Sequence, residues 1–569
     1  MNYNNSSKIQ FISFAILFLG ALLVTKLFFV QVIHGAAYSE EANRQYISPR
    51  GNIFERGSIL FTQKDGNTVS AAGLKVGYKI AIVPKNIVDG EHAYSALSQI
   101  IPIDHDSFIQ KVAKKSDPYE EIAVKVSKED ADKIDALHMS GISIYEQKWR
   151  FYPSSTMAAQ TIGFVGYKGD DFSGRYGLEK YYNDVLERTE ENLNVNFFAE
   201  VFSNISDSLF SNGKIEGDIQ TTIEPSVEDY LEQQLASVHD TYHPDAEGGI
   251  IINPKTGAIY AMSSLPNFDL NDFSGVTDPL TFSNPLAENV FEMGSVIKPL
   301  AMSAALDAGV LTAQTTYNDT GSVTLNGKKI SNFDGKARGV IPMQEVLNQS
   351  LNVGMVAVEQ KLGKDKLRDY FLGYGLGEKS GIDLPHEIPS LVGNLQSPRD
   401  VEYATAAFGQ GIALTPLATV RAFSAMVNGG TLITPHLVQK IIYKDGGEKV
   451  PVYPTSKSKI SPQTSEAISR MLVTVYDKAL KGGIYKMDHY SIASKTGTAQ
   501  VANPGGGGYY KDRYLHSFVG YFPAYDPQFL VFLYAVNPKG VEYASASLAE
   551  PFVNIAKFLL NYYNVSPDR

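Results

Sequence analysis

The sequence of 569 residues contains no cysteine and a single tryptophan. The absence of cysteine excludes disulfides, thiolate nucleophiles and cysteine-based metal sites, so any covalent chemistry would have to use an oxygen or nitrogen nucleophile. The sequence also lacks a run of basic residues, and its formal net charge is −11. Because nucleic-acid phosphates require clustered Lys and Arg, this charge pattern argues against a nucleic-acid partner.

Long apolar runs are also scarce, and the one that occurs is residues 11–33. As a helix this run would be about 34 Å long, which suits one membrane crossing. Lys26 lies toward its C-terminal end, where a flexible side chain can reach the membrane interface. A cleaved signal peptide is the alternative, with residues 35–37 as the cleavage site, but the run is long for one. We predict a cytoplasmic tail (1–10), a single-pass anchor in the cytoplasmic (inner) membrane, and an extracytoplasmic or periplasmic remainder.

The length and composition of the chain predict two soluble domains in addition to this anchor. Apolar residues make up 44% of the chain and charged residues 20%, as in globular proteins with a packed core. Residues 38–217 alternate short strand-like and helix-like patterns, which predicts a mixed α+β domain. Residues 218–569 begin with a strand-like segment and an amphipathic helix from Pro225, and we expect a second α+β domain there. Ser127 and Ser461 are the predicted N-caps of helices that run toward Leu137 and Leu480. A final helix is expected at about 548–563.

Ser295 and Lys298 are the first candidate catalytic pair. Three residues apart on a helix, a hydroxyl and an amine lie on one face, where the amine can activate the serine without a histidine. Ordinary Ser and Lys usage gives roughly two such spacings in a chain of this length, and Ser456 with Lys459 is another. That second pair lies in a polar stretch, whereas an apolar, helix-like segment follows Lys298, which favours Ser295.

Two further motifs follow Ser295 in the chain. They are Ser350-Leu351-Asn352 and Lys495-Thr496-Gly497-Thr498. A second Lys-Thr-Gly, residues 255–257, precedes the serine, and a β-hairpin turn between two strand-like segments accounts for it. Each motif alone is weak, but the three in this order are a specific signal.

The ordered motifs resemble those of the penicillin-recognising serine enzymes. The resemblance covers nearly the whole chain and narrows to the class B penicillin-binding proteins, which are monofunctional transpeptidases. It implies a penicillin-binding/β-lactamase-like transpeptidase domain, an antiparallel sheet flanked by helices, after a pedestal or dimerisation-type domain. The sequence departs from the family at Met293, where proline is common, and at Ser494, where glycine is usual. The supporting segments are residues 50–56, 174–179, 408–411, 414–416 and 428–430.

The resemblance also implies a role for each motif residue. Ser295 would attack the penultimate D-alanine of a peptidoglycan stem peptide, release the terminal D-alanine and form an acyl-enzyme, with Lys298 as the base. Burial beside Lys495 would lower the pKa of Lys298 enough for this role. Ser350 would relay the proton to the leaving amine, and Asn352 would hold the stem-peptide backbone. An amine of a second strand would then take the acyl group.

The third motif would bind the substrate's terminal carboxylate and stabilise the transition state. Lys495, Thr496 and Thr498 would contact the carboxylate, and Gly497 completes this substrate-binding strand. The backbone N–H groups of Ser295 and Thr498 would form the oxyanion hole. This chemistry requires neither a cofactor nor a metal.

Other patterns have simpler interpretations. His239 and His243 have the spacing of a zinc helix, but Asp240 replaces the expected Glu and Pro244 ends the helix, so we expect a surface helix end. The glycines of residues 505–508 are not followed by the Lys-Ser/Thr of a phosphate-binding loop, and we expect a flexible loop.

Within the resemblance, several functions stay open. A β-lactamase is disfavoured, because residues 345–348, which only superficially resemble its deacylation element, precede the second motif instead of following it. A D,D-carboxypeptidase or a non-catalytic scaffold or β-lactam sensor are the alternatives to the transpeptidase. Residues 350–354 are more similar to the septal than to the elongation branch. A septal enzyme implies as partners an integral-membrane glycosyltransferase and divisome proteins, with β-lactams as covalent inhibitors.

Overall fold

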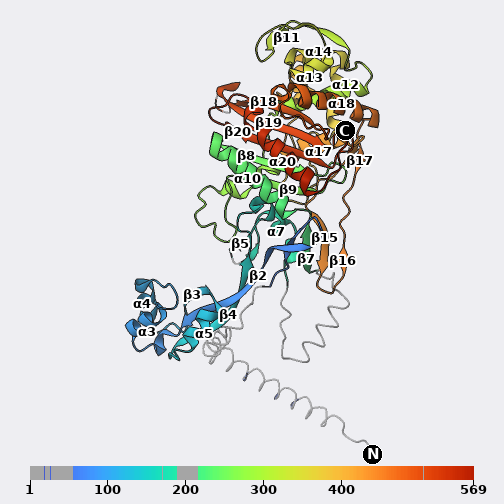
Figure 1. Cartoon of the computed structure of the whole chain (residues 1–569). Helices are drawn as coiled ribbons and strands as arrows, with labels where there is room; N and C mark the ends of the chain where they lie inside the picture. Colours follow the sequence, from blue (N-terminus) through green and yellow to red (C-terminus); the bar gives the residue numbers. More distant parts are fainter. Residues whose placement is uncertain are drawn as a thin grey trace, which may run out of the picture. The chain divides into compact units, whose positions relative to one another are not determined.

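The computed structural model describes residues 14, 18, 26, 55–169, 171–188, 216–503, 505 and 507–569. The chain folds into two compact units (Figure 1). Of the described residues, the smaller unit comprises mainly 74–149, and the larger comprises 56–73, 150–188 and those from 216 to 569. The predicted anchor, residues 11–33, lies almost entirely outside the described residues. Among those that are described, no helix is both long and apolar enough to span a bilayer.

A five-stranded antiparallel sheet forms the centre of the larger unit. Its strands run in the order β18, β19, β20, β8, β9. Central strand β20 is buried along almost its whole length, as expected for a strand covered on both faces. Strand β18 is at the edge of this sheet, so alternate backbone groups face away from its neighbour. The bounds are β8 Ala246–Ile252, β9 Ile259–Leu265, β18 Ala493–Ala502, β19 Tyr509–Phe522 and β20 Phe529–Val536.

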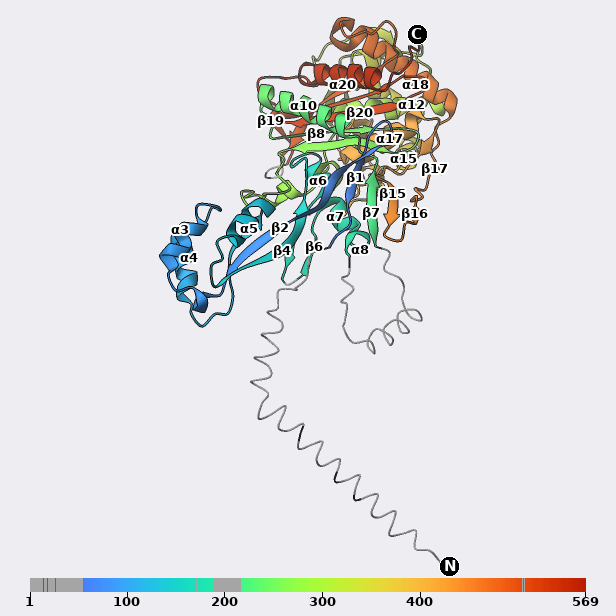
Figure 2. The ribbon, with the colours of Figure 1, turned by 60° about the horizontal axis from the view of Figure 1, so that its bottom comes forward.

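Helices cover both faces of this sheet. Helices α10 (Pro225–Tyr242) and α20 (Ala549–Tyr562) lie side by side over one face (Figures 1 and 2). Ile251 of β8 packs in their cluster, whereas Ile250 and Ile252 pack in the main core on the other face. This alternation follows from the two-residue period of a strand. That main core includes the helices α12 (Lys298–Asp307), α17 (Pro416–Val427) and α18 (Pro462–Thr474).

Local signals placed several helix boundaries correctly. Ser461 is the N-cap of α18, and its side chain accepts a hydrogen bond from the backbone of Thr464, as predicted. We expected this helix to continue to Leu480, but the regular α-helix ends at Thr474 and a wider π-helical turn, Val475–Ala479, follows. The final helix, predicted at 548–563, is confirmed as α20.

A second sheet of the larger unit brings together two of the family-like segments. It contains β1 (Ile59–Thr62), β7 (Gly217–Thr221), β15 (Val438–Tyr443), β16 (Glu448–Lys449) and the start of β2 (Thr68–Ile82). Next to it, the buried carboxylate of Glu179 binds Arg56 Nε and Arg150 Nε, each at 2.6 Å. Burial alone would raise the pKa of Glu179, but the two arginines hold it below its ordinary value. Residues 50–54 of the first segment lie outside the described residues.

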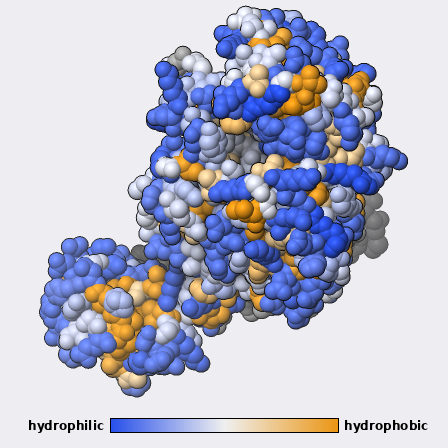
Figure 3. All heavy atoms as spheres, turned by 45° about the horizontal axis from the view of Figure 1, so that its top comes forward, coloured by the Kyte–Doolittle hydropathy of each residue, from blue (hydrophilic) through white to orange (hydrophobic). Residues whose placement is uncertain are grey.

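The smaller unit has the mixed α+β character expected for this region. The later part of β2 pairs with β3 (Glu120–Val126) and β4 (Ile142–Phe151). The helices α3 (Gly90–Leu97), α4 (His105–Ala113) and α5 (Lys128–Asp135) complete it, with a core of apolar side chains. Ser127 caps α5 by accepting from the backbone of Asp130, which confirms the predicted helix start. Figure 3 shows hydrophobic residues gathered on one face of this unit.

Candidate active site

Ser295 lies on a tight turn that two glycines make possible. The turn is the 3₁₀ segment η4 (Gly294–Ile297), and α12 begins directly after it with Lys298. Gly294 has φ +62° and Gly409 has φ +81°, and Gly294 N donates to Gly409 O at 3.1 Å. A Cβ on Gly409 would overlap the carbonyl of Gly294. Only glycine fits both positions. The segment 408–411 therefore packs directly against the backbone of the serine turn.

The turn packs closely against edge strand β18. A Cβ on Gly497 would overlap Ser517 Oγ and lie 2.6 Å from the carbonyl oxygen of Met293. Ser517 Oγ itself donates to that carbonyl at 2.9 Å. The glycine of the third motif therefore allows the turn that carries Ser295 to lie directly against the strand.

Both predicted lysines bind the hydroxyl of Ser350. Lys298 Nζ donates to the Ser350 carbonyl oxygen at 2.5 Å and to its Oγ at 3.2 Å. Lys495 Nζ donates to the same Oγ at 2.9 Å and to Thr496 O at 2.9 Å. The three motifs thus meet at one side chain. We expected Lys298 to reach Ser295, yet its hydrogen bonds go to Ser350.

Burial changes the charge state of both lysines. Their residues are 0% and 2% exposed, respectively. Burial, followed by the charge of Lys495, lowers the pKa of Lys298 well below its ordinary value. Burial lowers the pKa of Lys495 to about 7. The shift of Lys298 favours its neutral amine, and a neutral amine can accept a proton.

Ser350 adopts an unusual backbone conformation. It lies between α13 (Met343–Asn348) and α14 (Asn352–Leu362), with φ +53°. For a non-glycine residue this left-handed conformation costs on the order of 1–3 kcal/mol and persists only where neighbours enforce it. The backbone bond from Leu351 N to Val346 O (2.9 Å) and the lysine bond to the Ser350 carbonyl do so.

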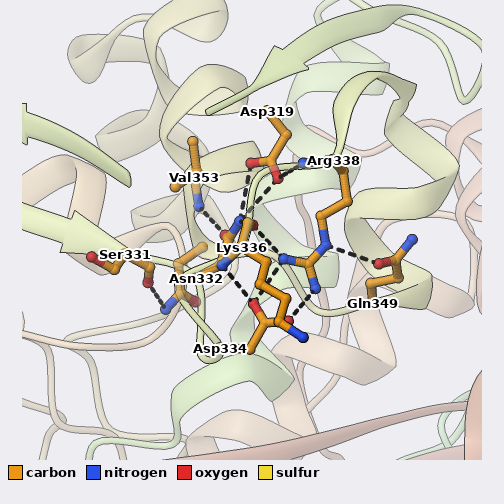
Figure 4. A network of polar contacts seen from close by, with 9 residues as sticks. Asp319, Ser331, Asn332, Asp334, Lys336, Arg338, Gln349 and Val353 are labelled. Carbon is orange, nitrogen blue, oxygen red and sulfur yellow. Dashed lines mark hydrogen bonds and ion pairs between the residues drawn. The ribbon is translucent and has the colours of Figure 1, made fainter. Parts of the chain in front are cut away.

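Asn352 begins α14, and a neighbouring loop binds it. Its Nδ2 donates to Ser331 O at 3.1 Å. The next side chain of that loop, Asn332, accepts from Val353 N at 3.1 Å and belongs to a polar network with Asp319 and Arg338 (Figure 4). Since an amide nitrogen carries two N–H groups, Asn352 retains one for a ligand.

The hydroxyl of Thr498 has a defined direction. Its Oγ1 accepts from Ala544 N at 3.1 Å, so its own proton is available to donate to a ligand. His516, opposite Thr498 on β19, is buried and holds the same loop through Ser547 Oγ (2.7 Å) and Glu542 O (3.1 Å). Thr496, two residues before Thr498 on β18, is half-buried.

Sequence reasoning missed several residues that support these groups. Asn332, His516 and Ser517 carry no local motif, because they act through contacts with distant segments. Glu292 was also missed: it accepts from Gly411 N at 3.1 Å and from Tyr509 OH at 2.8 Å. Only for Glu292, His516 and Ser517 could polarity within an otherwise apolar stretch have been a signal.

The simpler interpretations of other patterns hold. Residues 255–257 form the turn between β8 and β9, as predicted. His243 ends α10 in a left-handed conformation, which confirms the helix end, and His239 binds Glu247 at 2.8 Å. At the departure from the family pattern, Ser494 is 1% exposed and its hydroxyl has no hydrogen-bond partner among the described residues.

Comparison with known families gives the same result as this geometry. Residues 248–557 match the penicillin binding protein transpeptidase domain, and residues 46–211 match the penicillin-binding protein dimerisation domain. The chain belongs to the class B penicillin-binding proteins.

Relatives of this penicillin-binding protein span nearly its whole length. Stage V sporulation protein D of Bacillus subtilis is 31% identical over 559 residues, covering 96% of this chain and 84% of the relative. Peptidoglycan D,D-transpeptidase FtsI of Buchnera aphidicola is 26% identical over 585 residues, covering 100% of this chain and 96% of the relative. A crystal structure of penicillin binding protein 2X from Streptococcus thermophilus has a TM-score of 0.73 at 20% identity. The match covers 90% of this chain and 81% of the chain in that structure. This likeness confirms the predicted fold.

Proposed function

We propose that this penicillin-binding protein is a peptidoglycan D,D-transpeptidase of septal cell-wall synthesis, with Ser295 as its nucleophile. The observation that carries the proposal is the Ser350 hydroxyl, which binds both Lys298 and Lys495 and so joins the three motifs. The relative named as a D,D-transpeptidase, which aligns along the whole chain, supports the same activity.

Acylation uses the serine turn and the edge strand. Ser295 Oγ attacks the carbonyl carbon of the penultimate D-alanine while its proton passes to the neutral amine of Lys298. The carbonyl oxygen becomes an oxyanion between the N–H groups of Ser295 and Thr498. Loss of one such donor generally costs about 3 kcal/mol. The C–N bond then breaks, and the proton returns through Ser350 Oγ to the leaving D-alanine amine.

Substrate binding and deacylation use the remaining groups. Lys495, Thr496 and Thr498 bind the terminal carboxylate, and the free proton of Thr498 Oγ1 supports this role. Asn352 binds the peptide backbone. An amine of a second stem peptide attacks the ester carbonyl and loses a proton to the lysine pair, and Ser295 leaves with a proton restored.

The placement of the protein in the cell is part of the same proposal. Residues 11–33 anchor the chain, residues 38–217 form the pedestal and residues 218–569 the catalytic domain outside the cytoplasm. The two family matches support this division. An integral-membrane glycosyltransferase and division proteins are the proposed partners. The hydrophobic face of the smaller unit in Figure 3 supports a protein contact there.

Two measurements on one protein preparation test the activity. The protein without residues 1–35 is incubated with a fluorescent penicillin, and its intact mass is compared with that of Ser295→Ala. Ser456→Ala is the matched control, because Ser456 has the same Ser-x-x-Lys spacing on an exposed segment. We expect one adduct per chain in the wild type and control and none in Ser295→Ala.

The second measurement supplies a stem pentapeptide donor and an amine acceptor. Mass spectrometry should detect the cross-linked product together with free D-alanine. Release of D-alanine without any cross-link would identify a carboxypeptidase instead. A wild type that forms no penicillin adduct would support a non-catalytic scaffold.

A further inference from the structure

Asn332 makes hydrogen bonds in two directions from a buried position. It follows β12 (Lys328–Ser331) and is 3% exposed. Its Oδ1 accepts from Val353 N at 3.1 Å. Its Nδ2 donates to both carboxylate oxygens of Asp319, at 3.0 and 3.1 Å, and to Lys336 O at 3.3 Å (Figure 4). The side chain therefore connects a buried carboxylate to the first turn of α14.

The first turn of α14 needs this acceptor. The opening N–H groups of a helix have no partner within the helix, and the N-cap side chain usually accepts one of them. Here the N-cap is Leu351, which has no side-chain acceptor. Asn332 takes over this function from a segment 21 residues away in sequence.

Asp319 sets the orientation of the Asn332 amide. Its carboxylate is buried and also accepts from Arg338 N at 2.9 Å. A flipped amide would present Oδ1 to this carboxylate and Nδ2 to Val353 N, and both contacts would be repulsive. The carboxylate thereby keeps Oδ1 directed at α14.

The same loop holds the residue before Ser350. Arg338, which binds Asp334 through two bonds of 2.8 Å, donates from Nε to Gln349 Oε1 at 3.1 Å. Asn352 in turn donates to Ser331 O. Contacts from one loop thus hold the second motif before and after Ser350.

We infer that Asn332, oriented by Asp319, is the positioning residue of the second motif in this enzyme. It fixes the start of α14 so that Ser350 Oγ stays within hydrogen-bond distance of both lysines and Asn352 stays beside the substrate. The inference rests on the proposed function, because it assigns the catalytic roles to Ser350 and Asn352. A displacement of about 1 Å in such a group can slow a reaction about 100-fold.

An exchange of the two side chains tests the inference. Asn332→Asp places a second carboxylate about 3 Å from Asp319, and two such groups cannot both be ionised comfortably. We expect it to slow penicillin acylation about 10- to 100-fold at pH 8. The double variant Asp319→Asn/Asn332→Asp restores a donor opposite a carboxylate and should recover most of the rate. Asn318→Asp, an exposed neighbour on β10 (Thr316–Asp319), is the matched control and should acylate like the wild type.

The pH dependence separates positioning from general damage. Once protonated, the carboxyl group introduced by Asn332→Asp can donate to Asp319 and still accept from Val353 N. The acylation rate of this single variant relative to wild type should therefore rise as the pH falls. Among the described residues, the other charged or titratable side chains that face this site are Tyr317, Asp334 and Arg338, and all variants keep them. Melting temperatures should stay close together for the double variant and wild type.

Three outcomes would overturn the inference. They are wild-type acylation in Asn332→Asp, a folded double variant as slow as the single variant, or a relative rate that does not depend on pH. If the single variant fails to fold, the double variant alone decides. Failure of the wild type to react would instead remove the proposed function, so the two failures are distinguishable.

Discussion

Replacement of Lys495 by methionine should raise the pH at which this enzyme acylates. The Nζ atoms of Lys298 and Lys495 bind one oxygen, Ser350 Oγ, at 3.2 and 2.9 Å. They lie no more than about 6 Å apart, where two unit charges interact by roughly 3 kcal/mol at an effective dielectric constant of about 20. The positive charge of Lys495 therefore lowers the pKa of Lys298, in addition to the larger effect of burial.

The size of the shift follows from the charge state of Lys495. Because its own pKa is about 7, Lys495 carries only part of its charge near neutral pH. The full interaction of roughly 3 kcal/mol corresponds to a little over about 2 pH units. We therefore expect the acid limb of the acylation profile of Lys495→Met to lie about 1–2 pH units higher than that of the wild type. The sign is fixed: loss of a neighbouring cation raises the pKa of Lys298, so more alkaline conditions are needed to deprotonate it.

The assay is the first-order acylation rate at saturating penicillin, measured across pH. Saturation removes the effect of Lys495 on binding the drug carboxylate. Lys495→Arg is the matched control, because guanidinium keeps its charge throughout this range. The acid limb of its acylation profile should lie at the same pH as in the wild type or at a lower pH. An unshifted limb in Lys495→Met, or equal shifts in both variants, would refute this account of Lys298.

Two further predictions concern packing around the same strand. Ser494→Ala removes a buried hydroxyl that has no partner among the described residues and keeps the Cβ in β18, so the protein should become more stable by about 1 kcal/mol, measured by denaturant unfolding. A less stable variant would indicate that this hydroxyl is satisfied. Gly497→Ala should lose nearly all acylation, because its Cβ would displace the turn that carries Ser295, and an unchanged rate would contradict the close packing.

Features set by neighbouring residues were predictable from the sequence. Ser127 and Ser461 cap their helices because a cap depends on residues two or three positions away. The order of the three motifs likewise predicted which residues would lie together.

Features set by distant contacts were not predictable. The spacing of Ser295 and Lys298 suggested a direct hydrogen bond, but the bond goes to Ser350, 52 residues away, because the left-handed backbone there presents both its oxygens to the lysine. The π-helical turn after Thr474 is similar, since nothing in its residues marks the change of helix pitch. Asn332 has no sequence signal, because its function depends on which helix start lies opposite it.

Three glycines around the serine turn limit how this enzyme can evolve. Gly294, Gly409 and Gly497 lie where any added side chain would meet neighbouring backbone or strand atoms, so these three positions tolerate almost no substitution. Substitution is easier where side chains face solvent beside the motif residues, as at Phe333 and Tyr543, which contact each other and are 63% and 45% exposed. Phe333 follows Asn332, and Tyr543 precedes Ala544, which binds Thr498. Substitutions that β-lactams select in this protein should therefore gather in such exposed loops rather than at the three glycines.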